Sequence, residues 1–180
     1  MRIKGLSLPL RQTSRALAVS AAVLLTAGAL RAQSDESVVL PQAAAARFAK
    51  RQLCSRPGPP KFTGTWTPSE SDIHALESHL PQISELRTRE GPMSRGGKRI
   101  EDPAAYYRQY LGIRVGGRNL IYVNAFDEFT AKQLQEYKAK IDWRETPIIG
   151  CDGGQSFWGV VYDPATGKFS DLEINLSMGG

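Results

Sequence analysis

The amino-acid sequence predicts an α+β fold in which an antiparallel sheet of two hairpins carries helices on one face. Three observations lead to this two-layer prediction. Two pairs of β-rich segments are joined by glycine-containing turns, two segments have apolar residues at helical spacing, and the 180-residue chain has two cysteines. We expect residues 62–180 to form one such domain, held by one disulfide.

The first helix is predicted after Thr67-Pro68-Ser69-Glu70. Thr67 and Glu70 have the spacing of a capping box, and Pro68 suits the first helical position. The apolar residues that follow lie on one helical face: Ile73, Leu76, Leu80, Ile83 and Leu86. Pro81 is expected to kink this helix or divide it in two, because proline cannot donate a backbone hydrogen bond.

The first hairpin is predicted from two β-rich segments, residues 106–115 and 120–125. Paired glycines in the turn 116–119 permit the positive φ angles that tight hairpins need. A second helix is expected from the capping-box spacing of Thr130 and Gln133. Its apolar face would consist of Leu134, Tyr137 and Ile141.

The second hairpin is predicted over residues 156–162 and 168–175, around a turn that contains Pro164 and Gly167. Both faces of the strand 156–162 carry apolar residues, since Trp158, Val160 and Tyr162 alternate with Phe157 and Val161. This strand is therefore expected to be central or covered on both faces.

The N-terminal 32 residues have the pattern of a secretory signal peptide. A basic leader precedes an apolar stretch from Ala16 to Ala29, which is shorter than the about 20 residues of a membrane span. Cleavage is expected after Ala32 or Ala29, which would place the mature protein in the periplasm or outside the cell, without a transmembrane span. Residues 33–61 contain an alanine run and a proline-rich breaker, and are expected to form an N-terminal arm and linker.

The charge balance changes when this leader is considered separately. The chain has 23 Lys and Arg against 18 Asp and Glu, a formal net charge of +5. The whole excess lies in the leader: Arg2, Lys4, Arg11, Arg15 and Arg31. The mature chain is thus expected to be neutral, which argues against nucleic acid as its partner.

Cys54 and Cys151 are predicted to form a disulfide, because an even cysteine count is typical of exported proteins. The alternative is that Cys151 acts as a nucleophile. A reactive thiolate needs a nearby cation to lower the pKa of its thiol, and the only histidines are His74 and His79. The disulfide is therefore the favoured interpretation.

Motifs for metal or catalysis are weak. Glu70, His74 and Glu77 share one helical stripe, but the stripe lies beside the apolar face and has no further ligand motif, so we interpret it as a solvated surface. His79 points away from His74. No nucleophile elbow or phosphate loop occurs, and we predict no metal and no cofactor.

Two candidate binding surfaces remain. A basic loop at residues 87–99, with Arg95, Lys98 and Arg99, would suit an anionic polymer, lipid or acidic protein, although a solvated loop is the simpler interpretation. The second candidate is an aromatic cluster on the sheet, represented by Tyr107, Trp158 and Tyr162. Most aromatic residues on these strands are expected to be core.

Together these features favour an exported, non-catalytic protein that binds a protein or envelope component, as an inhibitor or accessory factor. One alternative is a small envelope hydrolase that uses Cys151 or a pair of carboxylates. Another is a peripheral envelope protein that binds anionic polymer or lipid through the basic loop 87–99.

Overall fold

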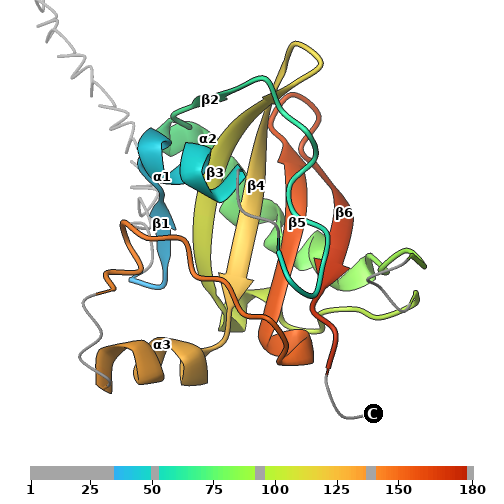
Figure 1. The fold of residues 1–180 in the computed structure, drawn as a ribbon. Coiled ribbons are helices and arrows are strands. Elements are labelled where there is room, and N and C mark those ends of the chain that lie inside the picture. Colours follow the sequence, from blue (N-terminus) through green and yellow to red (C-terminus); the bar gives the residue numbers. More distant parts are fainter. Residues whose placement is uncertain (1–34, 50–52, 92–95, 137–140, 178–180) are drawn as a thin grey trace, which may run out of the picture. The chain divides into compact units, whose positions relative to one another are not determined.

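The computed structural model describes residues 35–49, 53–91, 96–136 and 141–177 (Figure 1). It contains a six-stranded sheet in the order β1-β3-β4-β5-β6, with β2 also paired to β3. The strands are β1 (Ser37–Val39), β2 (Gly64–Trp66), β3 (Tyr107–Val115), β4 (Arg118–Phe126), β5 (Phe157–Asp163) and β6 (Lys168–Ile174). The helices are α1 (Gln42–Ala49), α2 (Glu70–His79) and α3 (Glu128–Glu136), with short 3-10 helices η1 (Leu80–Glu85), η2 (Pro103–Ala105) and η3 (Gly154–Ser156).

The two predicted hairpins are confirmed. Strands β3 and β4 pair antiparallel from Tyr107 opposite Phe126 to Val115 opposite Arg118. The turn between them consists of Gly116 and Gly117, whose φ angles are 55° and 78°. Residues with side chains rarely adopt this left-handed region, so the glycine pair fixes the register of the hairpin.

The sheet is mixed, whereas the sequence suggested purely antiparallel pairing. Strand β1 runs parallel to β3, and β2 runs antiparallel to the same strand farther along, with Thr65 opposite Ile113. Both short strands thus lie on the side of β3 that faces away from β4. Parallel pairing between residues about 70 positions apart leaves no local turn signal, which is why the sequence did not indicate it.

The expected arm at residues 33–61 contributes to the core. In addition to β1, it supplies helix α1, whose Ala44, Ala45 and Phe48 are buried. Leu40 and Leu53 are buried on either side of this helix. The alanine run has a structural role here, because small side chains let the helix backbone approach the sheet closely.

Helical residues pack against both faces of the sheet, whereas we expected them on one. Ile73 and Leu76 of α2 belong to a buried cluster with Tyr110, Val123 and Val160, which we call the α2 face. On the opposite side, which we call the α1 face, Ala44 and Phe48 pack with Leu111, Tyr122 and Val161. Side chains alternate between these two faces along β3, β4 and β5.

Two helices begin at residues other than those predicted. Helix α2 is capped by Ser69, which forms a capping box with Asp72 in place of the expected Thr67 and Glu70. At α3, the carboxylate of Asp127 accepts a hydrogen bond from the backbone N–H of Thr130. Carboxylates and serine are among the strongest N-cap residues, so they take the capping position from the nearby threonines.

Pro81 divides the first helical segment, as predicted. The α-helix ends at His79, and η1 continues from Leu80 with proline in its first turn. Leu76, Leu80 and Ile83 are buried along this continuous apolar surface. The change of helix type therefore keeps the apolar side chains on the α2 face.

The predicted disulfide is present. The Sγ atoms of Cys54 and Cys151 are 2.04 Å apart and join positions separated by 97 residues. The bond connects the end of the N-terminal segment to the chain just before η3. Among the described residues, no helix has the length and apolar character needed to cross a membrane.

Candidate binding pocket

Buried polar groups on the α2 face form one connected cluster. The guanidinium of Arg108 lies 3.4 Å from a carboxylate oxygen of Glu77, and its Nε donates to the hydroxyl of Tyr110 over 3.1 Å. The Tyr110 hydroxyl in turn donates to Glu77. Burial and the charge of Glu77 raise the pKa of Tyr110 far above its ordinary value. This phenol therefore stays protonated and serves as a hydrogen-bond donor.

A second buried cluster lies on the α1 face. Arg56 donates to the side-chain oxygens of Asn175 and Asn124, over 2.8 Å and 2.5 Å. The side-chain amide of Asn124 donates to Gln109 and to the carbonyl of Ile148. Asn175 donates to the carbonyls of Gly150 and Asp152. These bonds hold the segment around residues 148–152 against the sheet.

The arginines and amides of both clusters are buried. Arg56 is 3% exposed and Arg108 is 2% exposed. Asn124 and Gln109 are fully buried. Such side chains position loops and strands, because their hydrogen-bonding capacity is directed inward.

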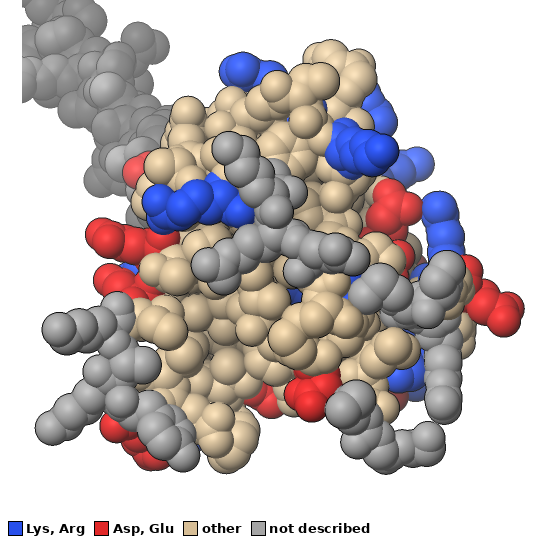
Figure 2. All heavy atoms as spheres, viewed as in Figure 1, with Lys and Arg blue, Asp and Glu red and all other residues tan. Residues whose placement is uncertain are grey.

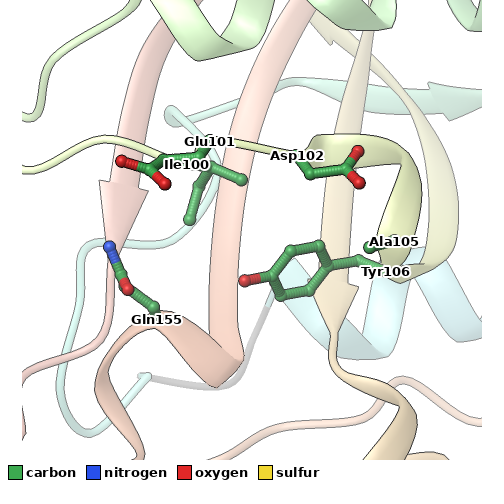
Figure 3. A pocket seen from close by; sticks show the side chains of 6 residues that line it. All are labelled: Ile100, Glu101, Asp102, Ala105, Tyr106 and Gln155. Carbon is green, nitrogen blue, oxygen red and sulfur yellow. The ribbon is translucent and has the colours of Figure 1, made fainter.

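An open pocket of about 370 Å³ lies at the end of the sheet where β3 and β5 begin. This volume falls within the range of about 300–1,000 Å³ for ligand sites. Its lining comes from the segment before β3 and from η3: Ile100, Glu101, Asp102, Ala105, Tyr106 and Gln155. Figure 3 shows the Tyr106 hydroxyl directed toward the side of the pocket where Glu101 and Gln155 lie.

Contacts outside the pocket fix the aromatic wall and the amide. The ring of Tyr106 meets the ring of buried Trp158 edge-on, with centroids 5.4 Å apart. The indole Nε1 of Trp158 has no hydrogen-bond partner among the described residues. Gln155 Nε2 donates to the carbonyl of Arg99 over 2.9 Å, so its side-chain oxygen stays available as an acceptor. Tyr106 and Gln155 are thus positioned by contacts within the chain.

The two pocket carboxylates have different surroundings. Asp102 accepts a hydrogen bond from the backbone N–H of Ala104 over 3.2 Å and begins η2. Glu101 forms an exposed ion pair with Arg99, with 2.9 Å between Oε1 and Nη2. Exposed pairs of this kind contribute little net stability and exchange readily with solvent.

The pocket has a negative electrostatic environment. Burial raises the pKa of Tyr106, and the carboxylates of Asp127 and Asp102 raise it further. Burial alone would raise the pKa of Asp127, but hydrogen bonds from Thr130 and Ser156 lower it overall. Asp127 is therefore ionised at neutral pH, because its pKa lies below the ordinary value of a carboxyl group.

The basic residues expected to form a binding loop are partly engaged within the chain. Arg95 lies outside the described residues, Lys98 is half-buried and Arg99 pairs with Glu101. Arg89 pairs with Asp171 over 3.3 Å, and Arg87 donates to three carbonyls at the end of η1. In Figure 2, Lys and Arg lie around the margin of the visible face among Asp and Glu, without forming one continuous patch.

The predicted aromatic cluster is divided between different environments. Trp158 and Tyr162 are fully buried on the α2 face, where the Tyr162 hydroxyl meets His79 Nδ1 at 2.9 Å. Tyr107 is half-buried beside Phe126 and Trp143 on the other face. Trp158 and Tyr162 therefore belong to the core, and Trp158 lies behind the pocket, where its ring contacts Tyr106.

The residues considered for metal binding and for nucleophilic catalysis take part in contacts within the fold. Among the described residues, no group of three or more His, Cys, Asp or Glu side chains is arranged to hold a metal. Glu77, one member of the stripe with Glu70 and His74, belongs to the cluster with Arg108 and Tyr110. Cys151 is bonded to Cys54, so no thiolate is available there in this oxidised structure.

The pocket was missed because its lining comes from distant segments. Gln155 follows Asp102 by more than fifty positions in the sequence. The sequence did contain one local signal, the adjacent acids Glu101 and Asp102 followed four residues later by Tyr106. No family model, curated protein or solved structure matches this chain.

Proposed function

We propose that this chain is an exported, non-catalytic protein that binds a protein partner of the cell envelope through the pocket lined by Glu101, Tyr106 and Gln155. The observation that carries the proposal is the pocket itself, an open cavity of about 370 Å³ lined by the ring of Tyr106, which packs against Trp158, and by the polar side chains of Glu101, Asp102 and Gln155. A cavity of this size with an aromatic wall and a few polar groups is typical of recognition sites.

The disulfide supports export. It closes a loop across 97 positions in a chain whose first 32 residues resemble a signal peptide. A protein that works in an oxidising compartment keeps this bond, and the bond also removes Cys151 as a nucleophile. Binding without covalent chemistry is therefore favoured over hydrolysis through that cysteine.

Export is tested by mass spectrometry of the protein recovered from the producing cell. Cleavage after Ala32 or Ala29 is expected, together with a non-reduced peptide that joins Cys54 to Cys151. A full-length cytoplasmic chain with free thiols would contradict the export proposal.

Binding is tested by photo-crosslinking in the intact producing cell. A photoreactive amino acid replaces Ala105, which is exposed and lines the pocket. The matched control replaces Ala165, an exposed alanine in the turn between β5 and β6 at the opposite end of the sheet. We expect a discrete crosslinked protein from position 105 that is absent from position 165.

The crosslink must also depend on the pocket. Replacing Tyr106 with leucine removes the aromatic wall and should abolish the adduct formed from position 105. Equal adducts from both positions, or an adduct that survives the leucine substitution, would contradict binding at this pocket.

A further inference from the structure

We infer that the pocket accepts a basic side chain, lysine or arginine, presented by the protein partner. The inference rests on the proposed function and adds the chemical class of the group that is recognised. It follows from the chemistry of the lining, the shape of the cavity and an ion pair already present at its edge.

The polar lining consists mainly of hydrogen-bond acceptors. Glu101 and Asp102 carry carboxylates, and the side-chain oxygen of Gln155 is left available because its nitrogen donates to Arg99. Lysine and arginine are the side chains that offer several donors and no acceptor. A neutral ligand that needs donors from the protein would find few in this lining.

The apolar part of the lining suits the stem of such a side chain. Ile100 is 1% exposed, so only a small part of it forms the floor of the cavity. The ring of Tyr106 is held in place by Trp158. Lysine and arginine bury their methylene groups along such surfaces, and an aromatic face attracts their charge.

Trp158 supports this aromatic wall from the core. Its side chain is fully buried, and its indole N–H lacks a hydrogen-bond partner among the described residues. Tyr106 is the lining residue that its ring contacts. The Trp158 ring therefore holds the Tyr106 ring in place from behind and adds no donor of its own to the pocket lining.

The chain already places one cation at the edge of the pocket. Arg99 Nη2 lies 2.9 Å from Glu101 Oε1, and both side chains are at least half exposed. The structure thus contains an internal example of the contact that a partner would make. An incoming lysine must share Glu101 with Arg99 or displace it.

This arrangement gives two substitutions with opposite expected effects. Glu101→Gln removes the acceptor charge and should weaken binding of a basic side chain by about threefold to tenfold. Arg99→Gln removes the internal competitor and should strengthen that binding by about twofold to fivefold. If Arg99 were itself a ligand for an anionic partner, its substitution would weaken binding instead.

The test is an NMR titration of the mature, oxidised protein with a blocked pentapeptide that contains one lysine among glycines. A matched peptide carries norleucine, which keeps the methylene stem and lacks the ammonium group. We expect the lysine peptide to bind at least about tenfold more tightly and to shift signals of residues 100–106 and the Gln155 side-chain amide. Its affinity should fall as salt is raised.

The control variant is Glu145→Gln, which removes an exposed acid from the loop between α3 and η3 that is not part of the pocket lining. It changes the net charge as Glu101→Gln does and should leave the affinity unchanged. Equal binding of the norleucine peptide, or equal weakening by Glu145→Gln, would overturn the inference. Each variant is first checked for a native amide spectrum, and Arg99→Gln provides a second, independent measurement.

Vesicles of phosphatidylcholine test the other source of an ammonium group. Binding to these vesicles without binding to the lysine peptide would overturn the assignment to a protein side chain. The crosslinking at position 105 remains a separate result. A crosslinked protein together with no lysine preference would leave the proposed function standing and reject only the ligand class.

Discussion

The two faces of the sheet bury an arginine in different ways. On the α2 face, Arg108 pairs with the carboxylate of Glu77 and contacts the Tyr110 hydroxyl. On the α1 face, Arg56 donates to the amide oxygens of Asn124 and Asn175, and its Nε has no partner among the described residues. Both arginines are at most 3% exposed.

This difference shows two solutions to the cost of burying a cation. An ion pair compensates the charge directly, while neutral amides compensate only part of the lost hydration. The amide solution needs a framework that holds the amides in place. On the α1 face that framework includes the disulfide. Cys54 lies two positions before Arg56. Cys151 directly follows Gly150, whose carbonyl accepts a hydrogen bond from Asn175.

Removal of the disulfide should have the largest effect and should act first on the α1 face. Substituting both Cys54 and Cys151 with alanine is expected to lower the free energy of unfolding by about 4 to 5 kcal/mol. Chemical denaturation of the oxidised protein and the double variant measures this loss. Hydrogen exchange should show lower protection around Ile148 than around Tyr110, and uniform loss on both faces would contradict the proposed division.

Replacing each arginine with methionine compares the two solutions directly. Arg108→Met leaves the Glu77 carboxylate, which is 25% exposed, without its cation, and should cost about 3 kcal/mol. Arg56→Met leaves the side-chain oxygens of Asn124 and Asn175 without their donor, which destabilises the fold. It also removes a buried cation that is not bonded to a carboxylate, which offsets part of that cost. We therefore expect the free energy of unfolding to fall by about 1 to 2 kcal/mol. Denaturation curves of the two variants test the order, and a larger loss for Arg56 would reverse the interpretation.

Gly159 tests the packing of the α1 face. A Cβ at this position would lie 2.0 Å from the hydroxyl oxygen of Tyr122, which is buried without a hydrogen-bond partner in the described structure. Gly159→Ala should therefore destabilise the protein by about 1 to 3 kcal/mol. Tyr122→Phe alone should be close to neutral, and it should recover part of the loss in the double variant. The absence of any recovery in thermal unfolding would show that Tyr122 is not the obstacle.

Glu173 gives the smallest expected effect, which appears as a pH dependence. Burial raises the pKa of Glu173 above 4.5, and the charge of Asp171 raises it further, although Arg89 and Arg56 oppose the shift. The folded state then binds this proton more tightly than the unfolded state. Stability should consequently decrease as the pH rises from about 4.5 through the folded-state pKa. Glu173→Gln should reduce the dependence of the free energy of unfolding on pH in this range, as measured by chemical denaturation at several pH values. An unchanged pH dependence would assign it to other groups.

Local signals explain the parts of the fold that the sequence predicts well. Gly116-Gly117 and the turn around Gly167 each specify a hairpin through conformations that few other residues adopt. Pro81 ends an α-helix for an equally local reason. The two cysteines identify their bond because no other cysteine competes for it.

The remaining features depend on contacts between distant residues. Nothing in the sequence near Ser37 indicates that it pairs with Arg108, and the alanine run before Arg47 does not reveal which face of the sheet it covers. The pocket depends in the same way on the approach of Gln155 to the carbonyl of Arg99. Trp158 and Tyr162 were candidates for an aromatic surface, but α2 and η1 cover the sheet face on which they lie.

The two edges of the sheet affect how this protein behaves at high concentration. One edge is built from β1 and β2, two separate strands of three residues each, and the other is β6, whose pairing has an irregularity near Gly159 and whose Asp171 has a φ angle of 54°. Short or distorted edges offer few aligned backbone groups to another chain. Edge-to-edge association between copies of this chain is therefore disfavoured, even where many copies are present at high concentration.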